Sequence, residues 1–291
     1  MTNSLKYQVP ILLGLPKGRM EKGIIRLLEE VGISVVGSER GYRPSISFPN
    51  TTAKTMKPQN IIEMLSHGRR DIGFAGADWV EELNADVVEV LDTGLDEVRL
   101  VAAVPREMAA KGLPDRKIVV TSEYERLAKK WILEQSLDAE FVRSYGATEV
   151  FPPEDADLVI DNVATGSTLK ANGLVAIDTI MRSSTRLLAS RAAMENDAKR
   201  DRIEAFRLVL ESALNARRRV MLEINASSEN LDELVALLPS MREATVAPLF
   251  AGAGFAIRAA VLRQNLPELL PVLKDAGGTD IVVSSIAQIV P

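Results

Sequence analysis

The chain has 291 residues, and its 35 Lys and Arg against 40 Asp and Glu give a formal net charge of −5. This mildly acidic balance excludes the strongly basic surface of a typical nucleic-acid-binding protein, and the length is typical of about two domains. The sequence has no cysteine and a single histidine, His67, which excludes disulfides, thiolate nucleophiles, zinc–cysteine sites and multi-histidine sites.

The first ten residues, MTNSLKYQVP, lack the apolar core of a signal peptide. No stretch reaches the roughly 18 consecutive apolar residues that a membrane helix needs. We therefore expect a cytoplasmic protein without a membrane partner.

Short apolar runs alternate with helical patterns over the first two-thirds of the chain. Strands are expected at 9–15, 71–76, 98–105, at the start of 117–135, and at 157–161; helices are expected at 20–32, at 77–83 and over the rest of 117–135. Ser122 and Glu125 have the spacing of a capping box, and His67 lies at a helix end, where capping and the helix dipole account for it. Such alternation is typical of parallel sheets covered by helices.

Four polar loops follow expected strands: LPKGRM at 15–20, GADW at 76–79, TSEYE at 121–125 and NVATGST at 162–168. Ligands of open α/β sheets bind beyond the carboxyl ends of the strands. These loops are therefore the expected location of a binding site.

The pattern changes near Arg217. Strands at 218–226, 244–249, 254–262 and 280–290, with helices at 227–239 and 266–278, give the order β-α-β-β-α-β. This order predicts a ferredoxin-like α+β domain. A long charged helix over 195–218 is expected to connect it to the preceding part, and the glycine-rich residues 250–257 are expected to form a loop.

The stretch DLVIDNVATGSTLKANGL (157–174) predicts a specific chemistry. A strand ending at Asp161 delivers a carboxylate that can hold a diol, and Thr165, Gly166, Ser167 and Thr168 follow in the next turn. Glycine permits close approach of the backbone, and hydroxyls, N–H groups and a helix expected from Leu169 favour a phosphate. Together they suggest a ribose 5-phosphate, although Thr165 or Ser167 could simply be an N-cap.

The run GATEVFPPEDADLVIDNVATGSTLKANGL (146–174) resembles the phosphoribosyl-diphosphate (PRPP) signature of ATP phosphoribosyltransferase, the first enzyme of histidine biosynthesis. LPKGRM, RRDIGFAGADWV, RKIVVTSEYERLAKKWI and LDELVALLPSMREATVAPL resemble the same family in the same order. The resemblance covers essentially the whole chain and includes the C-terminal module of the long, self-regulated form.

The resemblance implies an α/β catalytic part with the two lobes of type II periplasmic binding proteins, plus a C-terminal ACT-like domain. Lobe I would comprise residues 1–98 and 179–216, lobe II residues 99–178, and the regulatory domain residues 217–291. The family resemblance further implies ATP and PRPP as substrates, Mg²⁺ as cofactor, L-histidine as inhibitor, and a homo-oligomer, dimer or hexamer.

The implied reaction joins N1 of ATP to C1 of the PRPP ribose and expels pyrophosphate. It needs alignment and charge stabilisation rather than a nucleophilic side chain, which suits a chain so poor in catalytic residue types. The implied catalytic residues are Asp161, Lys17 and Arg19. The resemblance assigns PRPP binding to Glu149, Asp161, Thr165, Gly166, Ser167 and Thr168.

The resemblance assigns nucleotide binding to Lys17, Arg19, Asp78 and Arg99. Asp78 could instead cap its helix, and Arg99 could pair with a neighbouring acid. Glu223 and Thr245 match positions that line the histidine site in long-form members, although Glu223 could be an ordinary outward strand residue.

The sequence departs from the family pattern in three places. KPQNII (57–62) replaces a commoner R-P-x-D-I-P, PPEDADLV (152–159) is shorter than usual, and Asn162 replaces a commoner apolar residue.

Three other protein classes fit parts of the pattern. A solute receptor of the same fold would have a secretion signal, and a type I phosphoribosyltransferase usually has two adjacent acids before its T-G-x-T. Porphobilinogen deaminase anchors its cofactor on a cysteine, which this chain lacks.

Overall fold

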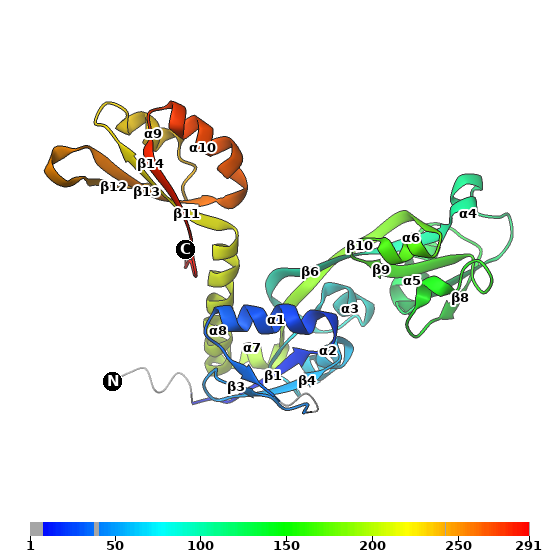
Figure 1. The fold of residues 1–291 in the computed structure, drawn as a ribbon. Coiled ribbons are helices and arrows are strands. Elements are labelled where there is room, and N and C mark those ends of the chain that lie inside the picture. Colours follow the sequence, from blue (N-terminus) through cyan, green and yellow to red (C-terminus); the bar gives the residue numbers. More distant parts are fainter. Residues whose placement is uncertain (1–7, 38–40, 242, 291) are drawn as a thin grey trace. The chain divides into compact units, whose positions relative to one another are not determined.

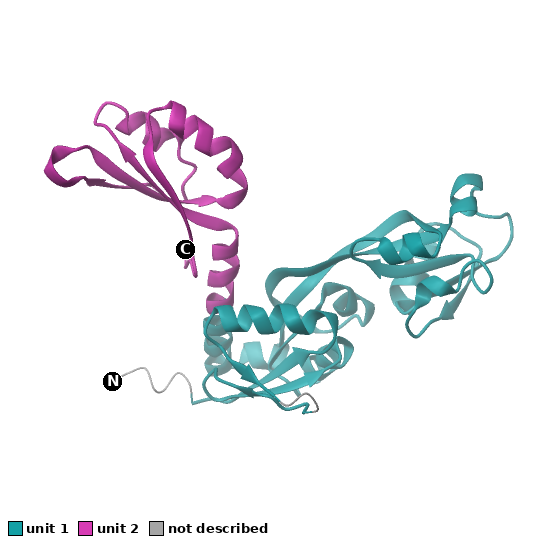
Figure 2. Ribbon diagram, in the orientation of Figure 1, with its two compact units in different colours: residues 1–207 teal, residues 208–291 magenta. Residues whose placement is uncertain are grey.

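The computed structural model describes residues 8–37, 41–241 and 243–290. The first seven residues, where no signal peptide is expected, lie outside this range. The chain separates into two compact units, residues 1–207 and residues 208–291 (Figure 2). No helix among the described residues is both long enough and apolar enough to cross a membrane.

Unit 1 is built on one eight-stranded sheet with the order β4-β1-β5-β10-β6-β9-β7-β8. Its strands are β1 (Ile11–Pro16), β4 (Thr51–Met56), β5 (Ile72–Gly76), β6 (Val87–Pro105), β7 (Ile118–Ser122), β8 (Ala139–Arg143), β9 (Leu158–Val163) and β10 (Leu174–Ser190). A separate small ribbon pairs β2 (Val35–Val36) with β3 (Ser45–Ile46).

Among the described residues, seven α-helices lie within unit 1, and the long α8 begins in unit 1 and continues into unit 2. They are α1 (Arg19–Glu30), α2 (Pro58–Ser66), α3 (Ala77–Glu82), α4 (Arg106–Lys111), α5 (Glu125–Glu134), α6 (Ser167–Ala171), α7 (Arg191–Glu195) and the long α8 (Asp197–Arg217). His67 is the C-cap residue of α2, as its sequence position indicated.

The sheet contains two groups of parallel strands. β4, β1 and β5 form one group, and β9, β7 and β8 form the other. Between the groups, β10 runs antiparallel to both β5 and β6, and β6 runs antiparallel to β9. The prediction of parallel sheets is thus confirmed for the outer groups and wrong at the centre, where two long strands connect the groups directly.

These two long strands define two lobes within unit 1. Figure 1 shows β6 and β10 side by side, running from the part that holds α1–α3 to the part that holds α4–α6. The expected lobe limits at 98/99 and 178/179 fall inside β6 and β10. The β6–β10 pairing is irregular there, with register shifts between Ala176 and Asp178 and between Thr179 and Met181.

Several strands were missed by the sequence prediction. β6 begins at Val87, well before the expected residue 98, and β4, β8 and β10 were not expected. Their sequences, such as TTAKTM in β4, carry many polar residues. Along β10 the side chains change from mostly exposed to mostly buried, so no single period-2 pattern marks the strand.

A core of buried apolar side chains packs α2, α3 and α5 against the sheet, including Ile61, Trp79 and Trp131. The ring of Trp79 on α3 stacks on Tyr124, with centroids 4.6 Å apart. Glu82 of α3 accepts hydrogen bonds from the backbone N–H groups of Arg126 and Leu127, both at 3.0 Å. The first turn of α5 is therefore satisfied from α3.

This arrangement overturns the predicted capping box. The Ser122 hydroxyl donates to Ile160 O (2.6 Å) and accepts from Tyr124 N (2.9 Å), and α5 begins only at Glu125. Ser122 ends β7 and fixes it to β9, so its hydroxyl serves the sheet rather than the helix.

Unit 2 has the predicted β-α-β-β-α-β order. Its elements are β11 (Arg219–Ala226), α9 (Leu231–Leu237), β12 (Thr245–Pro248), β13 (Phe255–Leu262), α10 (Leu266–Asp275) and β14 (Thr279–Ser285). The antiparallel sheet has the order β12-β13-β11-β14. Alternate residues of β11, such as Leu222 and Ile224, point into a core shared with Leu234 and Leu273 of the two helices.

The glycine-rich segment forms the expected loop up to Gly254, while residues 255–257 belong to β13. Gly254 has φ 119°, and a Cβ there would lie 2.3 Å from Ala226 O. This position requires glycine for both reasons.

The expected connector helix is interrupted at Asn196, whose φ/ψ of −86°/110° is extended, and continues as α8. The two compact units meet inside α8, after Arg207. Arg202 on α8 is only 2% exposed. Its guanidinium donates to the carbonyls of Val9, Pro49 and Asn50, which fastens the first half of α8 to unit 1.

Candidate active site

The loop after β9 has the form that its sequence suggested. Gly166 adopts a left-handed conformation with φ 80° and is the N-cap of α6, which begins at Ser167 rather than at the expected Leu169. The hydroxyls of Thr165 and Ser167 lie 3.0 Å apart. A left-handed residue at this turn explains the glycine.

One cavity of about 270 Å³ gathers all six residues to which PRPP binding was assigned; we call it the Asp161 pocket. Its lining residues are Glu149, Asp161, Asn162, Val163, Ala164, Thr165, Gly166, Ser167, Thr168 and Leu169. Glu149 enters from the short turn Thr148–Val150, which follows β8. The pocket thus combines two carboxylates with three hydroxyls and the first residues of α6.

The carboxyl group of Asp161 is half-buried, and its surroundings disfavour the ionised form. Burial raises its pKa to about 6, and the negative charges of Glu149 and Glu123 add to the rise, while a hydrogen bond from Asn162 N acts in the opposite direction. A carboxylate in such surroundings gains from hydroxyl donors or a cation in the pocket.

Asp78 does not line this pocket and is 2% exposed. Its Oδ1 accepts from the Ser183 hydroxyl (2.7 Å) and its Oδ2 from the Tyr124 hydroxyl (2.6 Å). No side-chain hydrogen bond caps α3, so the capping alternative is wrong. Because both carboxylate oxygens are bound by protein donors, Asp78 acts in this structure as a connecting residue.

Tyr124 extends this network to the Asp161 pocket. Its hydroxyl, besides donating to Asp78, accepts from Asn162 Nδ2 at 2.8 Å. Burial, with the nearby Asp78 charge, raises the pKa of Tyr124 well above its usual value, which keeps the hydroxyl protonated. Asn162, one of the departures from the family pattern, therefore ties the end of β9 to α3 and β10.

Arg99 lines a second cavity, of about 340 Å³, between β6, β9 and β10; we call it the hinge cavity. Its lining residues are Asp92, Glu97, Val98, Arg99, Val163, Ala164, Arg182, Ser183, Ser184 and Arg186. Val163 and Ala164 line both the hinge cavity and the Asp161 pocket, so the two spaces adjoin.

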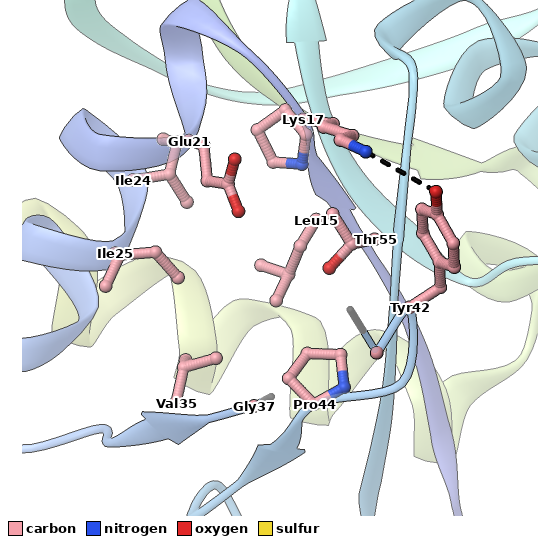
Figure 3. Close-up of a pocket in the computed structure, with 12 residues that line it drawn as sticks. Leu15, Lys17, Glu21, Ile24, Ile25, Val35, Gly37, Tyr42, Pro44 and Thr55 are labelled. Atoms are coloured by element: carbon pink, nitrogen blue, oxygen red, sulfur yellow. Dashed lines mark hydrogen bonds between the residues drawn. The ribbon is translucent and has the colours of Figure 1, made fainter. Parts of the chain in front are cut away.

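Lys17 and Arg19 follow β1, Lys17 directly after the strand and Arg19 as the first residue of α1. Lys17 lines a cavity of about 250 Å³ between β1, α1 and β4, where its ammonium lies 3.5 Å from the Tyr42 hydroxyl (Figure 3). Arg19 is exposed in the first turn of α1 and lines neither this cavity nor the Asp161 pocket. Lys17 likewise does not line the Asp161 pocket.

The ATP phosphoribosyltransferase family model matches residues 57–212, more than half of the chain. A chain from Pelotomaculum thermopropionicum described as "ATP phosphoribosyltransferase" is 34% identical over 285 residues, which cover 96% of this chain and 99% of the relative. The chain belongs to the ATP phosphoribosyltransferase family.

Two further comparisons describe the extent of this membership. An ATP phosphoribosyltransferase of Chlorobium luteolum is 34% identical over 296 residues and covers all of both chains. The model described as "HisG, C-terminal domain" matches residues 216–288, so the chain is a long-form ATP phosphoribosyltransferase.

The solved structures bear on the fold. The ATP phosphoribosyl transferase (HisG:HisZ) complex from Thermotoga maritima contains a chain that matches with a TM-score of 0.62 at 23% identity, covering 69% of this chain and 96% of that chain. The expected fold class, a periplasmic-binding-protein-like α/β catalytic part followed by an α+β domain, is confirmed.

In the C-terminal domain of this phosphoribosyltransferase, Glu223 and Thr245 lie in one row across the sheet. Arg258 of β13 pairs in register with Glu223 on one side and with Thr245 on the other. Its guanidinium lies 3.1 Å from Glu223 Oε1. Glu223 points away from the domain core, as the alternative interpretation held, and Arg258 is a residue of this row that the sequence prediction missed.

The catalytic part contains two further residues that the sequence prediction missed, Tyr124 and Arg182. Tyr124 stood in TSEYE, a loop already marked as polar, but its partners lie 46 and 38 positions away. Arg182 stood in a segment that was not expected to be a strand, so nothing indicated that it would face Arg99.

Proposed function

We propose that this chain transfers the phosphoribosyl group of PRPP to N1 of ATP and releases pyrophosphate, the first step of histidine biosynthesis. The observation that carries the proposal is the Asp161 pocket, in which a strand-end carboxylate and the T-G-S-T hydroxyls line one cavity sized for a small phosphorylated sugar. Membership of the ATP phosphoribosyltransferase family supports the substrate pair.

In the proposed reaction the lone pair of adenine N1 forms a bond to C1 of the ribose. The bond between C1 and the pyrophosphate oxygen breaks, and its electron pair leaves with pyrophosphate. The transition state has oxocarbenium character, so the enzyme contributes alignment and charge stabilisation. No side chain has to act as a nucleophile, in agreement with a sequence that has no cysteine and one histidine.

Different residues of the Asp161 pocket would bind the phosphate and the ribose of the substrate. Thr165, Ser167 and Thr168 would donate to the 5-phosphate, with Gly166 allowing the backbone to approach it. Asp161 in its ionised form would accept hydrogen bonds from the ribose hydroxyls, and its negative charge would favour positive charge on the ribose ring. Glu149 would bind the ribose on the same side as Asp161.

Mg²⁺ is the proposed cofactor. No group of three or more His, Asp or Glu side chains among the described residues could form a metal cage by itself. Two carboxylates, Asp161 and Glu149, do line the pocket, and Mg²⁺ is commonly held by one or two carboxylates together with substrate phosphates. When bound, the ion would neutralise the charge of the pyrophosphate.

The proposed nucleotide-binding residues are Lys17, Arg19, Asp78 and Arg99, and Lys17 and Arg19 are proposed to act in catalysis with Asp161. The C-terminal domain is proposed to bind L-histidine in the row of Glu223 and Thr245. The proposed oligomer is a dimer or hexamer, as the resemblance implies. The lobe limits at 98/99 and 178/179 remain part of the same proposal, since they place the Asp161 pocket in lobe II.

The test combines purified protein with ATP, PRPP and Mg²⁺ and follows phosphoribosyl-ATP and pyrophosphate by mass. We expect product that requires both substrates, and at least a 100-fold loss of kcat/KM in Asp161→Ala, in the range of about 10²–10³ for loss of an electrostatic group at the reacting centre. A folded Asp161→Ala protein with the normal rate and PRPP affinity would refute the site assignment.

A further inference from the structure

The hinge cavity holds two arginines that the structure leaves without acidic partners. β6 and β10 place Arg99 directly opposite Arg182 in register, and both line the cavity. Over the residues that the structure describes, neither makes an ion pair or a side-chain hydrogen bond. Their neighbour Arg186, in contrast, is paired with Asp92 and Glu89.

Two like charges directly opposite each other on antiparallel strands destabilise the pair. The acids of the cavity do not remove this repulsion. Asp92 is occupied by Arg186, the Ser184 hydroxyl and Gly94 N, and the exposed Glu97 forms no ion pair with any residue in the described part of the chain. An anion that accepts from both guanidinium groups would relieve the repulsion, and phosphates match the guanidinium fork with paired hydrogen bonds.

The position of the cavity indicates which anion. Arg99 pairs in register with Val163, and Val163 and Ala164 separate the hinge cavity from the Asp161 pocket. A group bound by Arg99 and Arg182 would therefore neighbour a sugar phosphate in that pocket. A polyphosphate meets this description, either the pyrophosphate of PRPP or the triphosphate of ATP.

We infer that Arg99 and Arg182 together form a polyphosphate subsite in the hinge cavity, next to the Asp161 pocket. This inference rests on the proposed function and adds Arg182 to the substrate-binding residues. Because the two arginines come from the two strands that join the lobes, one polyphosphate would hold both strands between the register shifts at Thr179/Met181 and Ser183/Thr185.

The test measures binding of pyrophosphate, tripolyphosphate and ribose 5-phosphate to the full-length protein by calorimetry. Arg182→Gln and Arg99→Gln should each weaken pyrophosphate or tripolyphosphate binding by about 10- to 100-fold, as expected for loss of hydrogen bonds to a charged group. Ribose 5-phosphate binding should stay unchanged. Arg26→Gln, which removes the same charge from the exposed face of α1, should change none of the three affinities.

Kinetics identify the source of the polyphosphate. A rise in KM for PRPP alone assigns the subsite to its pyrophosphate, and a rise for ATP alone assigns it to the triphosphate. Stability gives an independent readout. Without ligand, Arg182→Gln should unfold at the same or a higher urea concentration than the wild type, whereas Arg186→Gln should unfold at a lower one because it breaks two ion pairs.

Unchanged polyphosphate affinity in both arginine variants, or an equal loss of ribose 5-phosphate affinity, would overturn the inference. So would marked destabilisation by Arg182→Gln. Failure of the subsite and failure of the proposed function give different results. Arginine-dependent polyphosphate binding in a protein that makes no phosphoribosyl-ATP would refute only the function, and normal catalysis by both variants would refute only the subsite.

Discussion

If Asp161 holds the ribose as proposed, its carboxyl group should make catalysis sensitive to pH. Its pKa of about 6 reflects burial and the repulsion of Glu149 and Glu123, and the ionised form is the one that can accept from ribose hydroxyls. We expect kcat/KM for PRPP to be constant above pH 7 and to fall about tenfold per pH unit below pH 6. Asp161→Asn should lose activity and should lack this acidic limb.

The same pKa has the opposite effect on stability. A carboxyl whose pKa is raised on folding stabilises the protein fully below its unfolded pKa near 4, and this contribution is lost as the pH rises through 6. At pH 8, Asp161→Asn should therefore be as stable as the wild type or more stable, by up to about 3 kcal/mol. Urea unfolding at pH 4 and pH 8 tests the sign, and a less stable variant at pH 8 would contradict it.

Tyr124 offers a second prediction for a single residue. Tyr124→Phe keeps the ring stacked on Trp79 but leaves Asp78 Oδ2 and Asn162 Nδ2 without their shared partner. Unsatisfied buried polar groups cost about 1–3 kcal/mol, so the free energy of unfolding should fall by about that amount. Tyr145→Phe, at an exposed tyrosine, is the control and should be neutral within about 0.5 kcal/mol.

Whether the role of a single residue can be predicted depends on how far away its hydrogen-bond partners lie along the chain. The conformation of Gly166 and the position of Asp161 follow from neighbouring residues, and the sequence suggested both. The role of Asp78 depends on Ser183, 105 positions away, and on Tyr124, 46 positions away. Such partners are set by strand register and helix packing, which a single sequence does not display.

The attachment of α8 to the rest of unit 1 depends on one buried charged residue, Arg202. Arg202→Met should detach the first half of α8 from unit 1, because the carbonyls of Val9, Pro49 and Asn50 lose a charged donor. Hydrogen bonds to a charged group are worth about 1.5–3 kcal/mol each, so we expect a loss of at least 3 kcal/mol in unfolding free energy. Arg200→Met, at an exposed position on the same helix, should cost less than 1 kcal/mol.

Elements with a strong local pattern were predicted well, and those without one were missed. β11 alternates buried and half-buried residues along its whole length, and the order of unit 2 followed from such strands. β10 changes its surroundings midway and carries Asp178, Arg182 and Ser183 within a strand. Its extent is fixed by pairing with β6 over its full length, which is a tertiary constraint.

For the whole molecule, regulation and catalysis should be separable. If L-histidine binds in the row of Glu223, Arg258 and Thr245, Glu223→Gln should raise the inhibitory histidine concentration by about tenfold, the value of one hydrogen bond to a charged group. The rate without histidine should not change. Asn225→Ala, two residues along β11, is the matched control, and equal effects of the two substitutions would contradict the proposed site.

Removal of residues 218–291 extends this test. The Asp161 pocket and the hinge cavity are lined only by residues of unit 1. A folded truncated protein should therefore bind ribose 5-phosphate as the full chain does and should not respond to histidine. An unchanged histidine response would locate the inhibitor site in unit 1.

The pairing of β5 with β10 has a consequence for biosynthesis on the ribosome. Gly76 pairs with Thr185, so β5 keeps an open edge until β10 has been synthesised and has left the exit tunnel. At about 5–20 residues per second this delay lasts roughly 5 to 20 seconds. β6, β7, β8 and β9 are all synthesised before β10, so towards the end of the interval the half of the sheet with the Asp161 pocket can assemble first. Throughout the interval one edge of β5 has no strand to pair with, since its neighbour on that side is β10.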